Sequence, residues 1–243
     1  TLQEAAQVLG MHRLALVGGA VRDGLLHEVH HDPWRGLADL DFVLEGSSDE
    51  FATHLRDNLG EVRITELRQH GTFGTVELVL DGVRIDLAQS RKEYYPAPAE
   101  NPWVEPGCLE DDLVRRDFTI NAMALVLGDG GSVPELLDLH GGQRDLAARQ
   151  LNFLHARSVK DDPTRVVRAA RYAARLDFSL ALEALEQVRC TLEGWPWRWH
   201  QGDCLDSVPP ALSTRLRMEL ELLFEREPWR IAVVRLQEWG AMP

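Results

Sequence analysis

Cysteine is scarce in this sequence, and long apolar runs are missing. Three cysteines (Cys108, Cys190 and Cys204) stand far apart among 243 residues, and an odd, scattered set favours neither a zinc site nor a disulfide framework. No segment reaches the roughly 20 apolar residues that a bilayer-spanning helix needs, and the chain starts without a signal-peptide pattern. We therefore expect a cytoplasmic protein with reduced thiols.

Positive charge is also in short supply, because the net charge is −13. Taken alone, this excess of acid argues against nucleic acid as a partner. Between residues 144 and 175, however, arginine and lysine recur, against only three aspartates. This basic band is compatible with phosphate binding, so the overall charge does not decide the class of ligand.

Two aspartates, Asp39 and Asp41, lie in the apolar segment 37–44, which reads as a strand. Strand side chains alternate, so both carboxylates point to one side and Leu40 and Phe42 to the other. Adjacent carboxylates repel each other unless a cation lies between them, and Mg²⁺ accepts one or two carboxylates together with substrate phosphates. The segment predicts a metal site, and a solvated strand edge is the alternative.

Upstream of these aspartates the sequence predicts a strand at residues 14–17, followed by the pair Gly18-Gly19 and by a helix from Ala20. This order presents backbone N–H groups to a phosphate, although two glycines can also mark only a tight turn. Arg22 adds a candidate phosphate ligand.

A β-hairpin is predicted from two alternating segments, 74–80 and 83–87, joined by Asp81-Gly82. Asp86 lies in its second strand. If the hairpin packs beside the 37–44 strand, Asp86 becomes the third carboxylate of the metal site; otherwise it faces solvent.

Residues 91–108 contain four prolines and are expected to form a long irregular loop, of the kind that is often functional. Residues 109–127 are expected to form one helix, with Arg116, Asp117 and Asn121 on its polar side.

From residue 146 onward the pattern is helical. Asp162-Pro163 opens a helix on which Arg165, Arg168 and Arg171 recur at three-residue steps, followed by Arg175, and therefore line one face. An aspartate N-cap followed by proline accounts for Asp162 without a ligand. The arginines repel one another, so they need anions, either a phosphate or carboxylates of the N-terminal region.

Four segments together closely resemble the class II tRNA nucleotidyltransferases, the family of CCA-adding enzymes and bacterial poly(A) polymerases in the polymerase-β-like superfamily. In chain order they are LVGGAVRD (16–23), DLD (39–41), RRDFTINAMA (115–124) and DDPTR (161–165). The family usually has Glu-Asp where this chain has Asp161-Asp162, but the second position is kept.

The resemblance implies an α+β fold. A nucleotidyltransferase head with a small mixed sheet would occupy residues 1–142, and an all-α neck residues 143–243. Members of the family also carry helical body and tail domains that grip tRNA, and we expect these to be absent from this chain.

The resemblance also implies a set of catalytic roles. Asp39 and Asp41 would hold two Mg²⁺ ions, and Asp86 would help to activate the RNA 3′-hydroxyl for in-line displacement of pyrophosphate. Gly18, Gly19 and Arg22 would meet the triphosphate.

Other residues would bind the rest of the nucleotide. Arg116 and Asp117 would contact phosphate and ribose. Asp162 and Arg165 would read the Watson–Crick edge of the incoming base, with further nucleotide contacts from Arg168 and Arg171.

The implied activity is addition of C and A from CTP and ATP to the 3′ end of tRNA without a nucleic-acid template. A CC-adding specialist, an A-adding specialist and a poly(A) polymerase stay open as alternatives within the family. A nucleotide-binding module without catalysis is the alternative from another class. The oligomeric state is left open.

Overall fold

A computed structural model of the chain describes residues 2–11, 13–34, 36, 40–70, 74–128 and 132–242. It divides into two compact units. The first comprises residues 1–92, 104–116 and 120–143, and the second residues 93–103, 117–119 and 144–243. The second unit therefore takes two short segments from the N-terminal part of the sequence.

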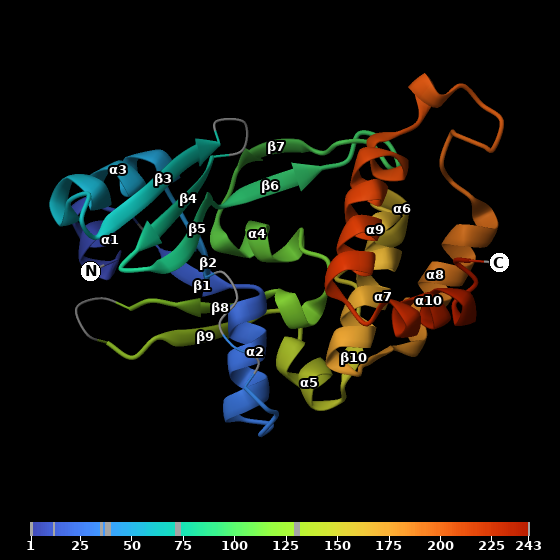
Figure 1. Cartoon of the computed structure of the whole chain (residues 1–243), viewed down its shortest axis with the longest axis horizontal. Coiled ribbons are helices and arrows are strands. Elements are labelled where there is room, and N and C mark those ends of the chain that lie inside the picture. Colours follow the sequence, from blue (N-terminus) through green and yellow to red (C-terminus); the bar gives the residue numbers. More distant parts are fainter. Residues whose placement is uncertain are drawn as a thin grey trace. The chain divides into compact units, whose positions relative to one another are not determined.

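The first unit is built on a seven-stranded sheet of order β3-β4-β5-β2-β1-β8-β9 (Figure 1). β2 and β5 are parallel and the other neighbours are antiparallel, so the predicted mixed sheet is confirmed. The strands are β1 (Leu14–Val17), β2 (Leu40–Leu44), β3 (Ile64–His70), β4 (Thr75–Leu80), β5 (Val83–Gln89), β8 (Met123–Val126) and β9 (Glu135–Asp138).

Helices cover both faces of this sheet. The pleat sends Phe42 and Leu44 of β2 into a core cluster with α1 (Leu2–Val8) and α3 (Ser48–Leu59). Val43 points to the opposite face and packs with α4 (Leu109–Val114). The helix α2 (Gly19–Glu28) follows β1 directly and packs against β1 and β8.

The predicted hairpin is present as β4 and β5. Asp81 and Gly82 form its two-residue loop with φ of 50° and 81°, the signs of a type I′ turn. Leu80 pairs with Val83 next to the turn, and this pair fixes the register of the other residues along β4 and β5.

The prediction of one helix over residues 109–127 is wrong. α4 ends at Val114, a 3₁₀ turn covers Thr119–Asn121, and β8 begins at Met123. The apolar run of β8 pairs with β1 and completes the sheet, so tertiary pairing overrides its local helical tendency. The prediction of an irregular loop over residues 91–108 is wrong at both ends, where β6 (Arg91–Tyr94) and β7 (Trp103–Pro106) form a two-stranded sheet.

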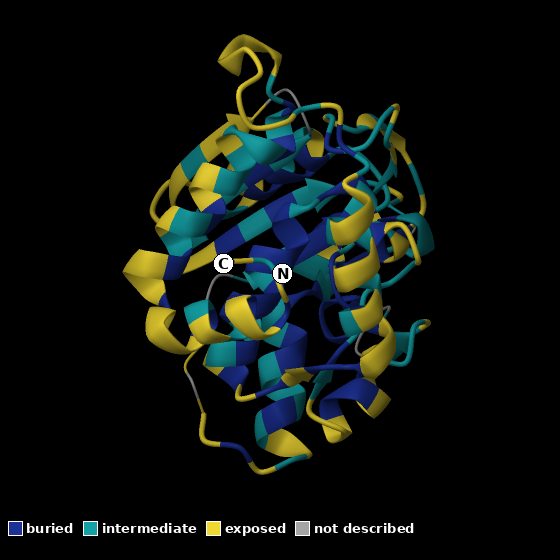
Figure 2. Ribbon diagram, turned by 90° about the vertical axis from the view of Figure 1, so that its right-hand side faces the viewer, coloured by how far each residue is buried: buried dark blue, intermediate teal, exposed yellow. Residues whose placement is uncertain are grey.

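The second unit is mainly helical, with α7 at its centre. α9 and α10 both pack on α7, and Figure 2 shows helices with buried residues on one side and exposed residues on the other. Its elements include α5 (Gly142–Ala147), β10 (Gln150–Leu151), α6 (Ser158–Asp161), α7 (Thr164–Leu176), β11 (Ser179–Leu180), α8 (Leu182–Gly194), two 3₁₀ turns (Leu205–Ser207 and Pro210–Leu212), α9 (Thr214–Arg226) and α10 (Trp229–Glu238). None of the helices in the described ranges is long and apolar enough to cross a membrane.

Candidate functional site

Two of the predicted carboxylates lie side by side in the sheet of the first unit. Asp41 of β2 and Asp86 of β5 are direct register partners in the parallel pair. Their apolar neighbours, Phe42 on β2 and Ile85 and Leu87 on β5, point to the face covered by α1 and α3. By alternation both carboxylates point to the opposite face. Asp39, the third predicted carboxylate, lies outside the described residues.

A further carboxylate stands in the same row. Glu77 of β4 is the register partner of Asp86, so it shares the face of Asp41 and Asp86, and its Oε1 lies 3.4 Å from His70 Nε2. Sequence reasoning missed Glu77. The two-residue Asp81-Gly82 loop could have revealed it, because a hairpin that starts from Leu80 opposite Val83 necessarily sets Glu77 opposite Asp86.

The donor chemistry of this row fits Mg²⁺. Carboxylate oxygens are the hard ligands that this ion prefers, and one or two of them suffice when substrate phosphates complete the shell. Within the described ranges, no three His, Cys, Asp or Glu side chains are grouped so that they could hold an ion by themselves. Among the described residues, the fit therefore rests on Asp41, with Asp86 as the neighbouring carboxylate in the row.

Gly18 brings backbone close to this carboxylate row. It ends β1 and N-caps α2 with φ 70° and ψ −135°, a conformation that favours glycine. A Cβ atom at this position would lie 3.3 Å from Asp41 Oδ2 and 3.4 Å from Arg116 Nη1. A carboxylate, a guanidinium and the N–H groups of a helix N-terminus thus converge on Gly18, an arrangement that suits an anion accompanied by a cation.

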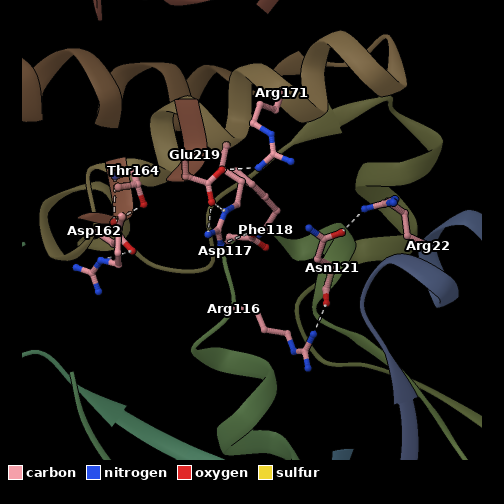
Figure 3. A network of polar contacts seen from close by, with 11 residues as sticks. Arg22, Arg116, Asp117, Phe118, Asn121, Asp162, Thr164, Arg171 and Glu219 are labelled. Atoms are coloured by element: carbon pink, nitrogen blue, oxygen red, sulfur yellow. Dashed lines mark hydrogen bonds and ion pairs between the residues drawn. The ribbon is translucent and has the colours of Figure 1, made fainter. Parts of the chain in front are cut away.

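Arg22 is almost fully buried, with 3% of its surface exposed. Its Nε and Nη2 donate to the Asp23 carboxylate at 2.8 and 2.9 Å. Its Nη1 donates to Asn121 Oδ1 at 2.7 Å (Figure 3). Arg22 therefore ties α2 to the 3₁₀ turn that holds Asn121. These bonds use three of the five guanidinium N–H donors, and contact of Arg22 with a triphosphate stays a prediction.

Arg116 is held by a buried partner. Its Nη2 donates to Asp112 Oδ2 at 2.9 Å, and the fully buried Asp112 also binds Arg115 at 2.6 Å. One carboxylate thus binds two guanidinium groups and balances the charge of only one of them. Arg116 Nη1, which lies near Gly18, also reaches the Asn121 carbonyl at 3.5 Å.

In the second unit, Asp162 and Arg165 lie at the start of α7 and are 8% and 4% exposed. Asp162 Oδ1 accepts from the Thr164 backbone N–H at 3.0 Å and from the Thr164 hydroxyl at 2.6 Å (Figure 3). The N-cap residue of α7 is Pro163 rather than the predicted Asp162. Asp162 nevertheless binds donors of Thr164 at the start of α7, as a capping aspartate would, and it uses one of its two carboxylate oxygens.

The arginine face of α7 is matched by glutamates. Arg168 donates to Glu219 Oε1 from Nε at 2.9 Å and from Nη2 at 2.5 Å. Arg171 donates to Glu219 Oε2 at 2.5 Å and to Glu227 Oε1 at 3.2 Å. Arg175 pairs with Glu227, from Nε at 2.9 Å. We name these five side chains the arginine–glutamate ladder.

Asp117 adds one more acid to Arg168. Its Oδ2 lies 3.5 Å from Arg168 Nη1, and its Oδ1 accepts from the Phe118 backbone N–H at 2.8 Å. The Phe118 ring packs on Phe153 and Tyr172 within the same unit. Burial alone would lower the pKa of the Arg168 guanidinium, but the charges of Asp117 and Glu219 outweigh it and raise that pKa above its usual range.

Phosphate or carboxylates of the N-terminal region were the two anions expected for the arginines. Of the described carboxylates that contact Arg168, Arg171 and Arg175, only Asp117 comes from the N-terminal region. Glu219 and Glu227 belong to α9 and to the segment that follows it, so the expectation is wrong for these two residues. Nucleotide contacts by Arg168 and Arg171 stay predictions. Glu219 lies on α9, and its position opposite α7 was not predictable from spacing.

Comparison with known proteins gives a consistent result. Residues 14–152 match the family described as the poly A polymerase head domain. A CC-adding tRNA nucleotidyltransferase of Deinococcus radiodurans is 43% identical over 230 residues, which cover 94% of this chain and 54% of that protein. An A-adding tRNA nucleotidyltransferase of Aquifex aeolicus is 42% identical over 171 residues, which cover 70% of this chain and 19% of that protein.

A solved structure shares the fold. A tRNA nucleotidyltransferase complexed with a primer tRNA and an incoming ATP analogue superposes with a TM-score of 0.77 and 29% identity, covering 99% of this chain and 61% of that one. The chain thus spans about half the length, or less, of the two curated relatives. The match over residues 14–152 covers more than half of the chain, and it includes the Gly18 turn, the carboxylate row and the RRDFTINAMA segment. The chain therefore belongs to the poly A polymerase head domain family, whose tRNA nucleotidyltransferase members its motifs resemble.

Proposed function

We propose that this protein adds C or A nucleotides, or both, from CTP and ATP to the 3′ end of tRNA without a nucleic-acid template. The observation that carries the proposal is the register pairing of Asp41 with Asp86 beside Gly18, in a chain whose relatives are named as CC-adding and A-adding tRNA nucleotidyltransferases. A binding module would not need two carboxylates on one face, where their repulsion is a cost without a cation.

In the proposed reaction Asp41, together with Asp39, would hold Mg²⁺. When bound, the ions would neutralise charge on the triphosphate and lower the pKa of the attacking hydroxyl. Asp86 would accept a hydrogen bond from the RNA 3′-hydroxyl and orient it toward the α-phosphate. The N–H groups at the start of α2 and the positive charge of Arg116 would bind the phosphates, with pyrophosphate as the leaving group.

Base selection would depend on α7. The Watson–Crick edges of C and A present an amino donor beside a ring-nitrogen acceptor, whereas U and G present a carbonyl acceptor beside an N–H donor. Asp162 as acceptor and Arg165 as donor complement C and A, and they leave U and G with opposed groups. Buried polar groups left unpaired by the wrong ligand give strong discrimination.

The test offers three tRNA acceptors, ending before CCA, in C and in CC, with CTP or ATP and Mg²⁺. We expect incorporation that separates the alternatives, because a CC specialist uses only CTP, an A specialist extends only the CC end, and a poly(A) polymerase continues past one A. Failure with every acceptor would overturn the proposal.

Asp41→Asn provides the site-directed arm of the same test. It keeps the shape of the side chain and removes its charge, so we expect the incorporation rate to fall at least about a hundredfold. Glu66→Gln is the matched control, because Glu66 is an exposed carboxylate on β3 of the same sheet, and it should leave the rate unchanged. An unchanged rate in Asp41→Asn would remove Asp41 from the metal site.

A further inference from the structure

Arg215, near the start of α9, lies against the second oxygen of Asp162. Its Nε is 3.9 Å from Asp162 Oδ2, about 1 Å longer than a hydrogen bond. This Nε is buried, and it has no hydrogen-bond partner within the part of the chain that the structure describes. A buried donor of this kind is costly, and the group that it faces is the carboxylate predicted to read the base.

The other end of the guanidinium is fixed. Arg215 Nη2 donates to the carbonyls of Ala99 and Glu100 at 3.2 and 3.1 Å. Ala99 is itself held in place, because its N–H donates to the Asp161 carbonyl and its carbonyl also accepts from the Ala211 N–H. Arg215 is thus anchored to backbone next to Asp162 rather than reaching across solvent.

The two oxygens of Asp162 therefore meet different groups. Oδ1 is occupied by the Thr164 N–H and hydroxyl, and Oδ2 faces the Arg215 cation. Thr164 fixes one side of the carboxylate, and the attraction of a charge that is 75% shielded from solvent fixes the other. Rotation of the carboxylate about its χ2 bond would break both arrangements at once.

We propose that Arg215 is a positioning residue for base selection, which acts by holding Asp162 Oδ2 in the orientation that accepts the amino group of C or A. This inference rests on the proposed function, since it requires Asp162 to read the base. Arg215 does not touch the nucleotide in this scheme. Its loss lets the carboxylate turn, so that U or G is no longer confronted by a fixed acceptor.

The test measures kcat/KM for CTP and UTP with the same acceptor tRNA. We expect Arg215→Gln to lower the CTP/UTP ratio about tenfold, equivalent to about 1.4 kcal/mol. Arg215→Lys keeps the charge but loses the planar guanidinium group, so its CTP/UTP ratio should lie between those of wild type and Arg215→Gln. Arg217→Gln is the matched control, because Arg217 is on the same helix with its side chain 73% exposed, and it should keep the wild-type ratio.

A double-mutant cycle with Asp162→Asn separates positioning from a general structural role. If Arg215 acts through Asp162, Arg215→Gln adds no further loss of selectivity in the Asp162→Asn background. Additive losses, or a wild-type ratio in both Arg215 variants, would overturn the inference while leaving the proposed function intact. A wild-type ratio in Asp162→Asn would overturn the inference together with the base-reading role.

The wild-type protein provides the reference. Its failure to incorporate CTP or ATP would instead refute the proposed function. Should Arg215→Gln fail to fold, as judged by circular dichroism, the ratio in Arg215→Lys decides the question, because the lysine retains charge and length.

Discussion

Replacement of Glu219 by glutamine is the sharpest test of what holds the second unit together. Glu219 is 5% exposed and accepts three hydrogen bonds from Arg168 and Arg171. With Asp117, the arginine–glutamate ladder contains three arginines and three carboxylates, so its net charge is zero. The substitution leaves this group, in which Arg171 and the carboxylates are buried and Arg168 and Arg175 are partly exposed, with a charge of +1. Arg168 and Arg171 also lose part of their shared partner.

The expected cost is about 3 kcal/mol of unfolding free energy. Loss of one partner from a buried ion pair typically costs about 3 to 5 kcal/mol, and the lower end applies because the glutamine carbonyl can still accept from one guanidinium. The control is Glu221→Gln on the same helix, since Glu221 and Arg217 form an exposed pair with side chains 57% and 73% accessible. That substitution should cost less than about 1 kcal/mol.

Urea unfolding followed by tryptophan fluorescence suits this comparison. Six of the seven tryptophans lie in the second unit, namely Trp103, Trp195, Trp197, Trp199, Trp229 and Trp239, so the signal reports mainly on the unit that contains the ladder. The midpoint should fall in Glu219→Gln with an unchanged slope. Equal midpoints in the Glu219 and Glu221 variants would refute the assignment of the ladder as a main source of stability.

Two further substitutions test the first unit. Gly18→Ala should destabilise the protein by about 1 to 2 kcal/mol. It should also abolish nucleotide incorporation, because the added Cβ would crowd Asp41 Oδ2. Gly24→Ala is the control, since a Cβ at this position of α2 meets open space, and it should be neutral or stabilising. Arg13 donates two hydrogen bonds to Glu110 and holds the pKa of that carboxyl at about 2 instead of 4.5. The pair therefore stabilises the fold fully above pH 4.5, so the difference in thermal stability between wild type and Glu110→Gln should vanish as the pH falls toward 2. A difference that persists at pH 2 would contradict this reasoning.

Local patterns in the sequence predicted the parts of the fold that depend on short-range chemistry. Asp81-Gly82 specified a two-residue turn, because both positions need positive φ. The alternation of apolar residues around Asp41 predicted that its carboxylate would point away from Leu40 and Phe42, whereas the placement of Asp86 was left open. Asp41 and Asp86 are neighbours because β5 pairs with β2. This pairing is a long-range contact that no local pattern encodes.

The failed helix at residues 109–127 shows the limit of such patterns. Its apolar spacing suits a helix, yet Asp117 to Thr119 belong to the second unit whereas the residues on both sides belong to the first. A straight helix cannot place Phe118 against Phe153 and Tyr172 while Met123 pairs into the sheet. The competing tertiary contacts decide the conformation, and they are invisible in a single sequence.

The partners of the arginines were unpredictable for a related reason. Spacing on α7 revealed a charged face that needed anions, but Glu219 lies 51 residues beyond Arg168 in the chain. Only the packing of α9 on α7 brings it into contact. Sequence reasoning could state the electrostatic requirement and could not identify the residue that meets it.

Helix capping and base reading were the two interpretations of Asp162 from the sequence, and the contacts of its carboxylate make them compatible. Capping uses only Oδ1, through the backbone and side chain of Thr164. A side chain that distinguishes an amino group from a carbonyl must hold an acceptor in place, since a carboxylate free to turn away would no longer oppose the carbonyl of U or G. Thr164 binds one oxygen of the carboxylate and Arg215 faces the other. If Asp162 reads the base as proposed, the local stability of the start of α7 is a precondition for selectivity rather than an alternative to it.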